Sequence, residues 1–366
     1  MDTTDRTAVI DAFLDTAGWG GAHRHPLPGD ASTRRYIRLE RGNERAMLMD
    51  QPAAAEAPEA PAGASVETRR ELGYNALARL AGGNLTAFAG LATALCERGF
   101  SAPRVLACDY EAGCLLLEDL GDDLFARLLP DREHEGTLYA RAVDALAAIY
   151  RSSFPRTLSA SGRSWTLADY DAAALMAEAD LFLDWYLARH AGVTIDAAAR
   201  EEWHRLWSEA FRRLETCPSG LVLRDFHAEN LIHLPDRDGE AAVGLLDFQD
   251  AVLGHPAYDL VSLLEDARRN VDRKLAAPLK ARFVERAGIE DAAGFDAAYA
   301  LLGAQRNAKI LGIFVRLAVR DGKPRYLDYL PRVARHFVSD LQHPVLMPLH
   351  MWAKSQAPAI FLEAHK

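Results

Sequence analysis

Two short segments of the chain carry side chains whose types and spacing could transfer a phosphoryl group. Residues 223–230 read Leu-Arg-Asp-Phe-His-Ala-Glu-Asn, and residues 245–250 read Leu-Leu-Asp-Phe-Gln-Asp. In phosphoryl-transfer loops, a carboxylate orients the acceptor hydroxyl, an Asn five residues later binds Mg²⁺, and a second Asp follows a nearby strand. The pattern predicts that Asp225 is the base and that Asn230 and Asp247 bind Mg²⁺, which prefers hard oxygen ligands.

The elements that position these side chains are predicted to be short strands. Residues 221–223 and 243–246 are apolar, so each segment enters its Asp from a strand. A lone Asp in such a place is otherwise a turn residue or a helix cap. The combination of strand, loop and strand favours catalysis. We expect His227 to hydrogen-bond within the loop and brace Asp225, with an ordinary structural histidine as the alternative.

Two further carboxylates follow the second segment. Asp250 is expected either to touch a second metal ion or to cap the next turn. Asp259, which opens a predicted helix, is expected to be an N-cap and loop brace and not a catalyst.

These residues, with the His two positions after the base, resemble those of the aminoglycoside phosphotransferase family. That family shares the protein-kinase fold and phosphorylates small hydroxyl compounds. Residues 29–36, 46–50, 115–121 and 305–314 are similar to one subgroup, the cell-wall amino-sugar kinases. This subgroup phosphorylates the anomeric hydroxyl of N-acetylmuramate and N-acetylglucosamine in peptidoglycan recycling. The resemblance, over about residues 10–340, implies ATP as the phosphate donor and Mg²⁺ as the metal ion.

The resemblance also implies an α+β, bilobal protein-kinase-like fold. We expect a small β-rich N-lobe over residues 1–118 and a larger helical C-lobe over residues 119–366. Residues 52–64 contain only Ala, Pro, Glu and Gly, which predicts an insertion that buries little apolar surface. Periodicity predicts strands near residues 35–39, 45–50, 104–108 and 114–118, and helices near 6–18, 66–80, 85–98, 138–150, 172–189, 203–214, 260–267, 275–286 and 295–317.

A turn of small residues beginning at Gly29 is the candidate phosphate-binding segment. Small side chains there would let backbone N–H groups approach phosphate oxygens, although Gly-Asp-Ala-Ser alone is more often an ordinary turn. The resemblance implies that adenine pairs with backbone groups of Glu118 and Leu120, with a plain strand end as the alternative. The expected nucleotide contacts are Gly29, Ser32, Thr33, Arg34, Arg35, Glu118 and Leu120.

The predicted strand at residues 46–50 lacks the Lys that normally holds the α and β phosphates in kinases. Glu71 is the one weak candidate for the helix Glu that would pair with such a Lys. We hypothesise that Arg34 or Arg35 supplies the missing charge, since guanidinium groups bind phosphate well. The alternative is two solvated arginines. The missing Lys also raises the possibility of a non-catalytic binding protein, against which the retained base and metal ligands argue.

Candidate substrate residues lie in the loop and on two predicted helices. Glu229 is next to the metal-binding Asn. Phe182 and Trp185 could form a wall for a sugar ring, although an aromatic stripe is more often core. Arg306 and Lys309 share one face of an apolar helix and could receive the lactyl carboxylate of N-acetylmuramate, with a solvated face as the alternative. These cations favour a neutral or anionic acceptor over an aminoglycoside or a choline-like alcohol.

Composition limits the other classes of function. The 366 residues carry a net charge of −10, which argues against a nucleic-acid partner. The first residues lack the pattern of a secretory signal, no run of about 18 apolar residues occurs, and the four cysteines are dispersed. We therefore expect a cytoplasmic protein whose partners are a nucleotide and a small amino sugar, with no nucleic acid and no membrane.

Overall fold

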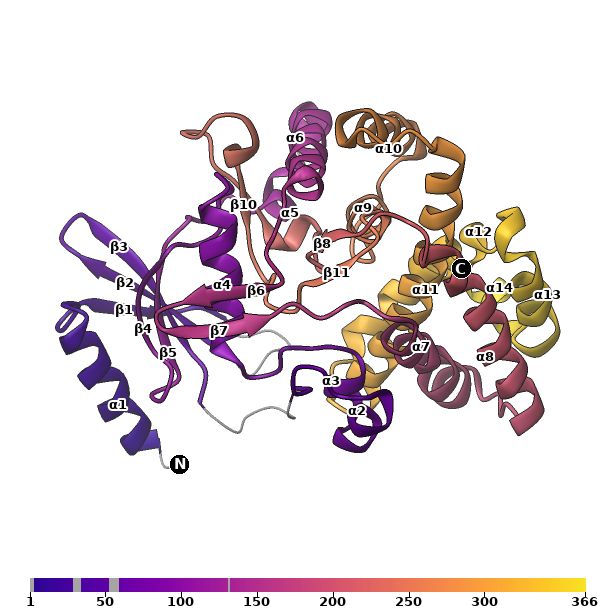
Figure 1. Cartoon of the computed structure of the whole chain (residues 1–366), viewed down its shortest axis with the longest axis horizontal. Coiled ribbons are helices and arrows are strands. Elements are labelled where there is room, and N and C mark those ends of the chain that lie inside the picture. Colours follow the sequence, from indigo (N-terminus) through magenta and orange to yellow (C-terminus); the bar gives the residue numbers. More distant parts are fainter. Residues whose placement is uncertain (1–2, 29–33, 53–58, 131) are drawn as a thin grey trace. The chain divides into compact units, whose positions relative to one another are not determined.

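The computed structural model describes residues 3–28, 34–52, 59–130 and 132–366 (Figure 1). The chain forms two compact units. The first comprises Met1–Ala145, Phe154–Ala168 and Glu229–Ala251, and the second comprises Leu146–Ser153, Asp169–Ala228 and Val252–Lys366. The lobe boundary expected between residues 118 and 119 stays a prediction, and the first compact unit continues past it.

An antiparallel sheet of five strands forms the β-rich part of the first unit, in the order β1-β2-β3-β5-β4 (Figure 1). Its strands are β1 (His23–Pro26), β2 (Arg35–Arg41), β3 (Glu44–Asp50), β4 (Val105–Asp109) and β5 (Cys114–Glu118). The predicted hairpin is confirmed, because β2 pairs with β3 and places Arg35 opposite Asp50. The predicted strand at residues 114–118 is confirmed with the same bounds.

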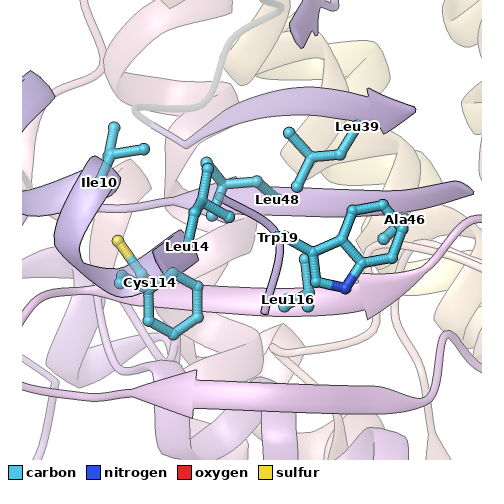
Figure 2. Packing of buried hydrophobic residues seen from close by; sticks show 9 residues of the cluster. Ile10, Leu14, Trp19, Leu39, Ala46, Leu48, Cys114 and Leu116 are labelled. Carbon is cyan, nitrogen blue, oxygen red and sulfur yellow. The ribbon is translucent and has the colours of Figure 1, made fainter. Parts of the chain in front are cut away.

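One face of this sheet is covered by α1 (Thr3–Thr16). Side chains alternate along a strand, so every second residue of β3 and β5 points to the same face. These are Ala46 and Leu48 on β3, and Cys114 and Leu116 on β5, all fully or almost fully buried. Figure 2 shows them packed with residues of α1 and the segment after it, namely Ile10, Leu14 and Trp19.

The remaining elements of the first unit are mostly helical. The prediction of a single helix over residues 66–80 is wrong. This segment forms two short helices, α2 (Val66–Leu72) and α3 (Tyr74–Leu77). The break is at Gly73, whose φ of 101° suits glycine and ends the first helix. This unit also contains α4 (Leu85–Cys96), α5 (Phe125–Leu128), most of α6 (Arg132–Arg151), a hairpin of β6 (Thr157–Ala160) and β7 (Arg163–Thr166), and a second hairpin of β9 (Leu231–His233) and β10 (Val243–Leu245).

The second unit is largely helical, as predicted. Its longest helix, α11 (Ala292–Val319), contacts α7, α9 and α12. The other helices are α7 (Ala172–Leu181) with a π-helical continuation (Phe182–Ala191), α8 (Ala197–Phe211), α9 (Ala257–Leu264), α10 (Arg273–Ala287), α12 (Leu330–Asp340), α13 (Met347–Gln356) and α14 (Ala359–Glu363). Within the described ranges, no helix combines the length and the apolar content that crossing a membrane requires.

Candidate active site

The loop that carries Asp225 begins directly after a strand of the second unit. β8 (Gly220–Val222) pairs with β11 (Val252–Gly254) in an antiparallel ladder. The Asp225 N–H donates to the Leu223 carbonyl at 2.9 Å, and the His227 N–H donates to the Asp225 carbonyl at 3.1 Å. These tight turns present the Asp225 side chain with part of its surface accessible. Asp225 therefore lies just after a strand end, as expected.

A buried carboxylate fixes the backbone just ahead of the base. Asp259 Oδ2 accepts a bond from the Leu223 N–H at 2.6 Å, and its Oδ1 accepts one from the Arg224 N–H at 2.8 Å. Arg224 has a φ of 71°, a left-handed conformation that is costly for a residue with a side chain and persists where its surroundings enforce it. The predicted loop brace is confirmed. The predicted N-cap role is wrong, because α9 begins two residues earlier, at Ala257.

Burial also acts on the charge of Asp259. It raises the pKa of this carboxyl to about 7, against the two backbone N–H bonds that favour the ionised form. A proton on one oxygen leaves lone pairs for the N–H groups, so the brace is compatible with both protonation states.

A buried ionic network surrounds Glu178 of α7. Its carboxylate accepts hydrogen bonds from the Arg224 guanidinium and from Gln305 Nε2, the latter at 3.1 Å. It also forms an ion pair with Lys309 Nζ at 3.3 Å. Lys309 also donates to the Tyr258 hydroxyl at 2.8 Å. Glu178 is therefore a counter-ion that two cations beside Asp225 share. The role of Glu178 was not predicted, although Glu178 and Asp180 interrupt the apolar run at residues 172–183 and were an available signal.

The same network explains the charge state of Asp225. Burial opposes its ionisation, but the positive charges of Lys309, Arg306 and Arg224 outweigh burial and hold its pKa below the ordinary value, and His227 adds to them only when it is protonated. His227 is itself buried, which lowers the pKa of its imidazole to about 4. At neutral pH the loop thus contains an ionised carboxylate beside a neutral histidine. An ionised carboxylate can accept a hydrogen bond from an acceptor hydroxyl, as a base requires.

The two predicted metal ligands lie at the same end of a short hairpin in the first unit. β9 (Leu231–His233) pairs with β10 (Val243–Leu245), with Leu245 opposite Leu231. Asn230 precedes β9, Asp247 follows β10, and the Leu246 N–H donates to the Asn230 carbonyl at 2.9 Å. Asp247 has a φ of 55°, which Asp adopts more readily than most residues.

The chemistry of this pair fits Mg²⁺. An amide oxygen from Asn230 and a carboxylate from Asp247 are hard donors, and the Asp247 side chain is 46% exposed, so phosphate oxygens and water can complete an octahedral shell. Across the described part of the chain, no group of three or more His, Cys, Asp or Glu side chains could hold a metal ion.

Arg34 of the first unit forms an ion pair with Asp247. Its Nη1 lies 3.4 Å from Asp247 Oδ1, its Nε donates to Gln51 Oε1 at 3.0 Å, and its Nη2 donates to the Gly82 carbonyl at 3.3 Å. The guanidinium is buried, so the alternative of a solvated arginine is wrong at this position. Arg35 is 58% exposed and pairs with Asp50 at 2.6 Å.

The other residues predicted to contact the nucleotide are Gly29, Ser32, Thr33, Glu118 and Leu120. Gly29, Ser32 and Thr33 lie outside the described residues. Glu118 ends β5, lies opposite Ala46 of β3 and donates its N–H to the Arg104 carbonyl at 2.9 Å. Leu120 is buried in a small cluster with Ile232 and Leu234.

The predicted substrate residues differ in how deeply they are buried. Phe182 is fully buried, and the centroid of its ring lies 5.2 Å from that of Tyr186 and 5.6 Å from that of Trp203. The ring therefore belongs to the core, and its expected place in a sugar-binding wall is wrong. Trp185, on the same π-helix, is half-buried, and Glu229 is exposed.

The two cations expected to receive a carboxylate are both buried, so a solvated helix face is wrong. Lys309 is committed to Glu178 and Tyr258, and its pKa is raised, because attraction to Glu178 outweighs the burial that opposes its charge. The Arg306 Nη2 donates to Ser262 Oγ at 2.7 Å.

Asp250 braces a different segment from the one expected. Its Oδ1 accepts a bond from the Ala81 N–H at 2.6 Å, at the start of the turn before α4. The neighbouring Gln249 donates from Nε2 to Asp247 Oδ1 at 3.0 Å. Both residues therefore position the segment that carries Asp247.

Comparison with known proteins places these features in a family context. Residues 23–301 match the family described as "Phosphotransferase enzyme family". An N-acetylmuramate/N-acetylglucosamine kinase of Caulobacter vibrioides is 45% identical over 97% of this chain and 98% of its own length. A kinase with the same name from Pseudomonas aeruginosa is 33% identical over 92% of each chain.

Solved structures extend the comparison to the fold. A choline kinase of Streptococcus pneumoniae has a TM-score of 0.54 at 12% identity, with 90% of this chain and 99% of its own covered. The gentamicin complex of an aminoglycoside phosphotransferase has a TM-score of 0.54 at 12% identity, with coverage of 95% and 98%. The predicted α+β, protein-kinase-like fold is confirmed.

Proposed function

Because the chain belongs to the phosphotransferase enzyme family, we propose that it is an ATP- and Mg²⁺-dependent kinase for the anomeric hydroxyl of N-acetylmuramate, N-acetylglucosamine or both. The observation that carries the choice of acceptor is the near full-length similarity to kinases named for these two sugars. In this proposal the sugars come from peptidoglycan, and the enzyme recycles them in the cytoplasm, where ATP is available.

The proposed reaction assigns a task to each residue of the catalytic loop. Asp225 accepts a hydrogen bond from the anomeric hydroxyl, holds its oxygen in line with the γ-phosphorus, and takes its proton late in the transfer. An anomeric hydroxyl is more acidic than an ordinary alcohol, so a carboxylate with a low pKa is a sufficient base. His227, neutral at physiological pH, keeps the loop in shape without adding charge.

On the nucleotide side, Asn230 and Asp247 would hold Mg²⁺ together with phosphate oxygens. When bound, the ion offsets the negative charge that grows on the leaving phosphate. Arg34 supports this role, because its guanidinium already lies beside Asp247 and can donate to phosphate oxygens in place of the missing strand Lys. On the acceptor side, the buried Arg306 would receive the lactyl carboxylate of N-acetylmuramate.

An ADP-release assay with a panel of acceptors tests the proposal. N-acetylglucosamine and N-acetylmuramate should support turnover, whereas the methyl glycoside of N-acetylglucosamine, which lacks a free anomeric hydroxyl, should not. Turnover only with choline or an aminoglycoside would preserve the family and overturn the acceptor. Turnover of the methyl glycoside would overturn the position of transfer.

We expect Asp247→Asn to raise the Mg²⁺ concentration for half-maximal activity by about tenfold or more, because it removes the carboxylate of the predicted ligand pair, and tenfold corresponds to ~1.4 kcal/mol. A magnesium titration at saturating ATP measures the change. Asp250→Asn is the matched control, since an amide oxygen can still accept the Ala81 N–H. An equal shift in both variants would contradict the assignment of Asp247 alone.

We expect Arg34→Ala to raise the KM for ATP by about tenfold to hundredfold, the range given by one or two charge-assisted hydrogen bonds. The KM for the sugar should remain near that of the wild type. Arg35→Ala, which removes an exposed arginine, should change the KM for ATP by about twofold at most. An unchanged KM for ATP in both variants would rule out the arginine hypothesis.

A further inference from the structure

The buried polar groups around the Asp225 loop include several whose hydrogen bonds are not made. Within the described residues of the second unit, His227 Nδ1, Asp266 Oδ2, and Arg306 Nε and Nη1 are buried without a partner. A buried polar atom left unpaired destabilises a protein, and native proteins pair nearly all of them. These four atoms, on three residues, leave hydrogen bonds that a polar ligand can complete.

The charges of these groups act on one another and on Asp225. The charge of Arg306 influences the pKa of both Asp225 and His227, and the charge of Asp266 influences the pKa of His227. α9 organises the group, because Asp259 braces the loop, Ser262 holds Arg306, and Asp266 follows two residues after the helix ends. The chain thus brings one acceptor and one cationic donor to the loop that carries the base.

Asp266 is held ready to accept a bond. It is 1% exposed, and its Oδ1 accepts the Arg268 N–H at 2.8 Å, which orients the carboxylate. Its charge also acts on Arg332, whose Nη1 donates to the Ala267 carbonyl at 3.1 Å. No role in the proposed reaction uses Asp266, yet an oriented carboxylate oxygen is the natural acceptor for a sugar hydroxyl.

We propose that Asp266 is a sugar-binding residue whose Oδ2 accepts a hydrogen bond from a ring hydroxyl away from the anomeric centre, while Arg306 binds the lactyl carboxylate. This inference rests on the proposed function. The two sugars share the hydroxyls at C4 and C6 and differ at O3, where N-acetylmuramate carries the lactyl group. Asp266 therefore contributes to the binding of both sugars, and Arg306 discriminates between them.

The test measures the KM for each sugar in Asp266→Asn and Arg306→Met. Asn retains an oxygen for the Arg268 N–H but replaces a charged acceptor. Asp266→Asn should raise the KM for both sugars by about tenfold to hundredfold and leave the KM for ATP within about twofold. Arg306→Met should raise the KM for N-acetylmuramate at least about tenfold more than that for N-acetylglucosamine. Asp328→Asn, at an exposed position of the same unit, is the control.

Deoxy sugars separate binding from a structural effect. If Asp266 accepts the C4 or C6 hydroxyl, the wild type should lose affinity for the corresponding deoxy-N-acetylglucosamine, and Asp266→Asn should lose little more. Equal penalties from the deoxy change in wild type and variant, for both positions, would overturn the inference, as would unchanged KM values in Asp266→Asn. Wild-type protein inactive on both sugars would instead overturn the proposed function, and the same variants would then be measured with the acceptor that does react.

Discussion

Asp225→Asn is expected to lower kcat by about 10²- to 10⁴-fold, the usual contribution of a positioned general base. The substitution keeps the size of the side chain and removes its ability to take the hydroxyl proton. Steady-state kinetics with saturating sugar and ATP give kcat, and titration with a fluorescent ATP analogue gives nucleotide affinity. Affinity should change by about threefold at most, because the expected nucleotide contacts lie elsewhere in the chain.

Asp236→Asn, which alters an exposed carboxylate in the loop between β9 and β10, provides the control for a change of net charge. It should retain wild-type kcat. A loss of kcat below about tenfold in Asp225→Asn would mean that the hydroxyl is activated by another group. His227 would not be the first candidate, since burial keeps its imidazole neutral and weakly basic.

Glu178→Ala is expected to destabilise the protein by about 3–5 kcal/mol, the cost of leaving buried charges without their counter-ion. The substitution leaves the Arg224 guanidinium and the Lys309 ammonium buried without the carboxylate that binds both. Urea unfolding followed by circular dichroism measures the change. Because Arg224 precedes the base, kcat should also fall at temperatures where the variant remains folded.

Two variants define the origin of this effect. Glu202→Ala removes an exposed carboxylate 3.7 Å from Arg205, and a surface pair of this kind contributes about 0–1 kcal/mol. Glu178→Gln retains hydrogen-bond acceptors and should fall between the wild type and Glu178→Ala. If Glu178→Ala destabilised no more than Glu202→Ala, the buried network would not hold the loop.

The parts of the fold that follow local rules could be predicted from sequence. β5 has the bounds that its apolar run indicated, and the β2–β3 hairpin follows from alternation. The division of the helix expected at residues 66–80 was missed because its periodicity continues across Gly73, whereas the backbone conformation there ends the helix. The periodicity of apolar residues predicts which face of a helix is buried, but it does not predict a backbone dihedral angle.

The supports of the candidate site were harder to predict because their partners are distant in the chain. Glu178 binds Arg224 from 46 residues away, and Lys309 pairs with it from 131 residues away. Spacing within one helix placed Arg306 and Lys309 on a common face. It could not show that Lys309 has a buried counter-ion, because that depends on a side chain of α7.

The position of the transferred phosphate tests the central claim most directly. Protein, Mg-ATP and either N-acetylglucosamine or N-acetylmuramate would be incubated, and the product examined by ³¹P NMR with correlation to sugar protons. Asp225→Asn at the same concentration is the control. The account predicts a new phosphate signal coupled to the proton on C1, strongly reduced with the variant. A signal coupled only to protons on another carbon, or an equal signal from the variant, would contradict it.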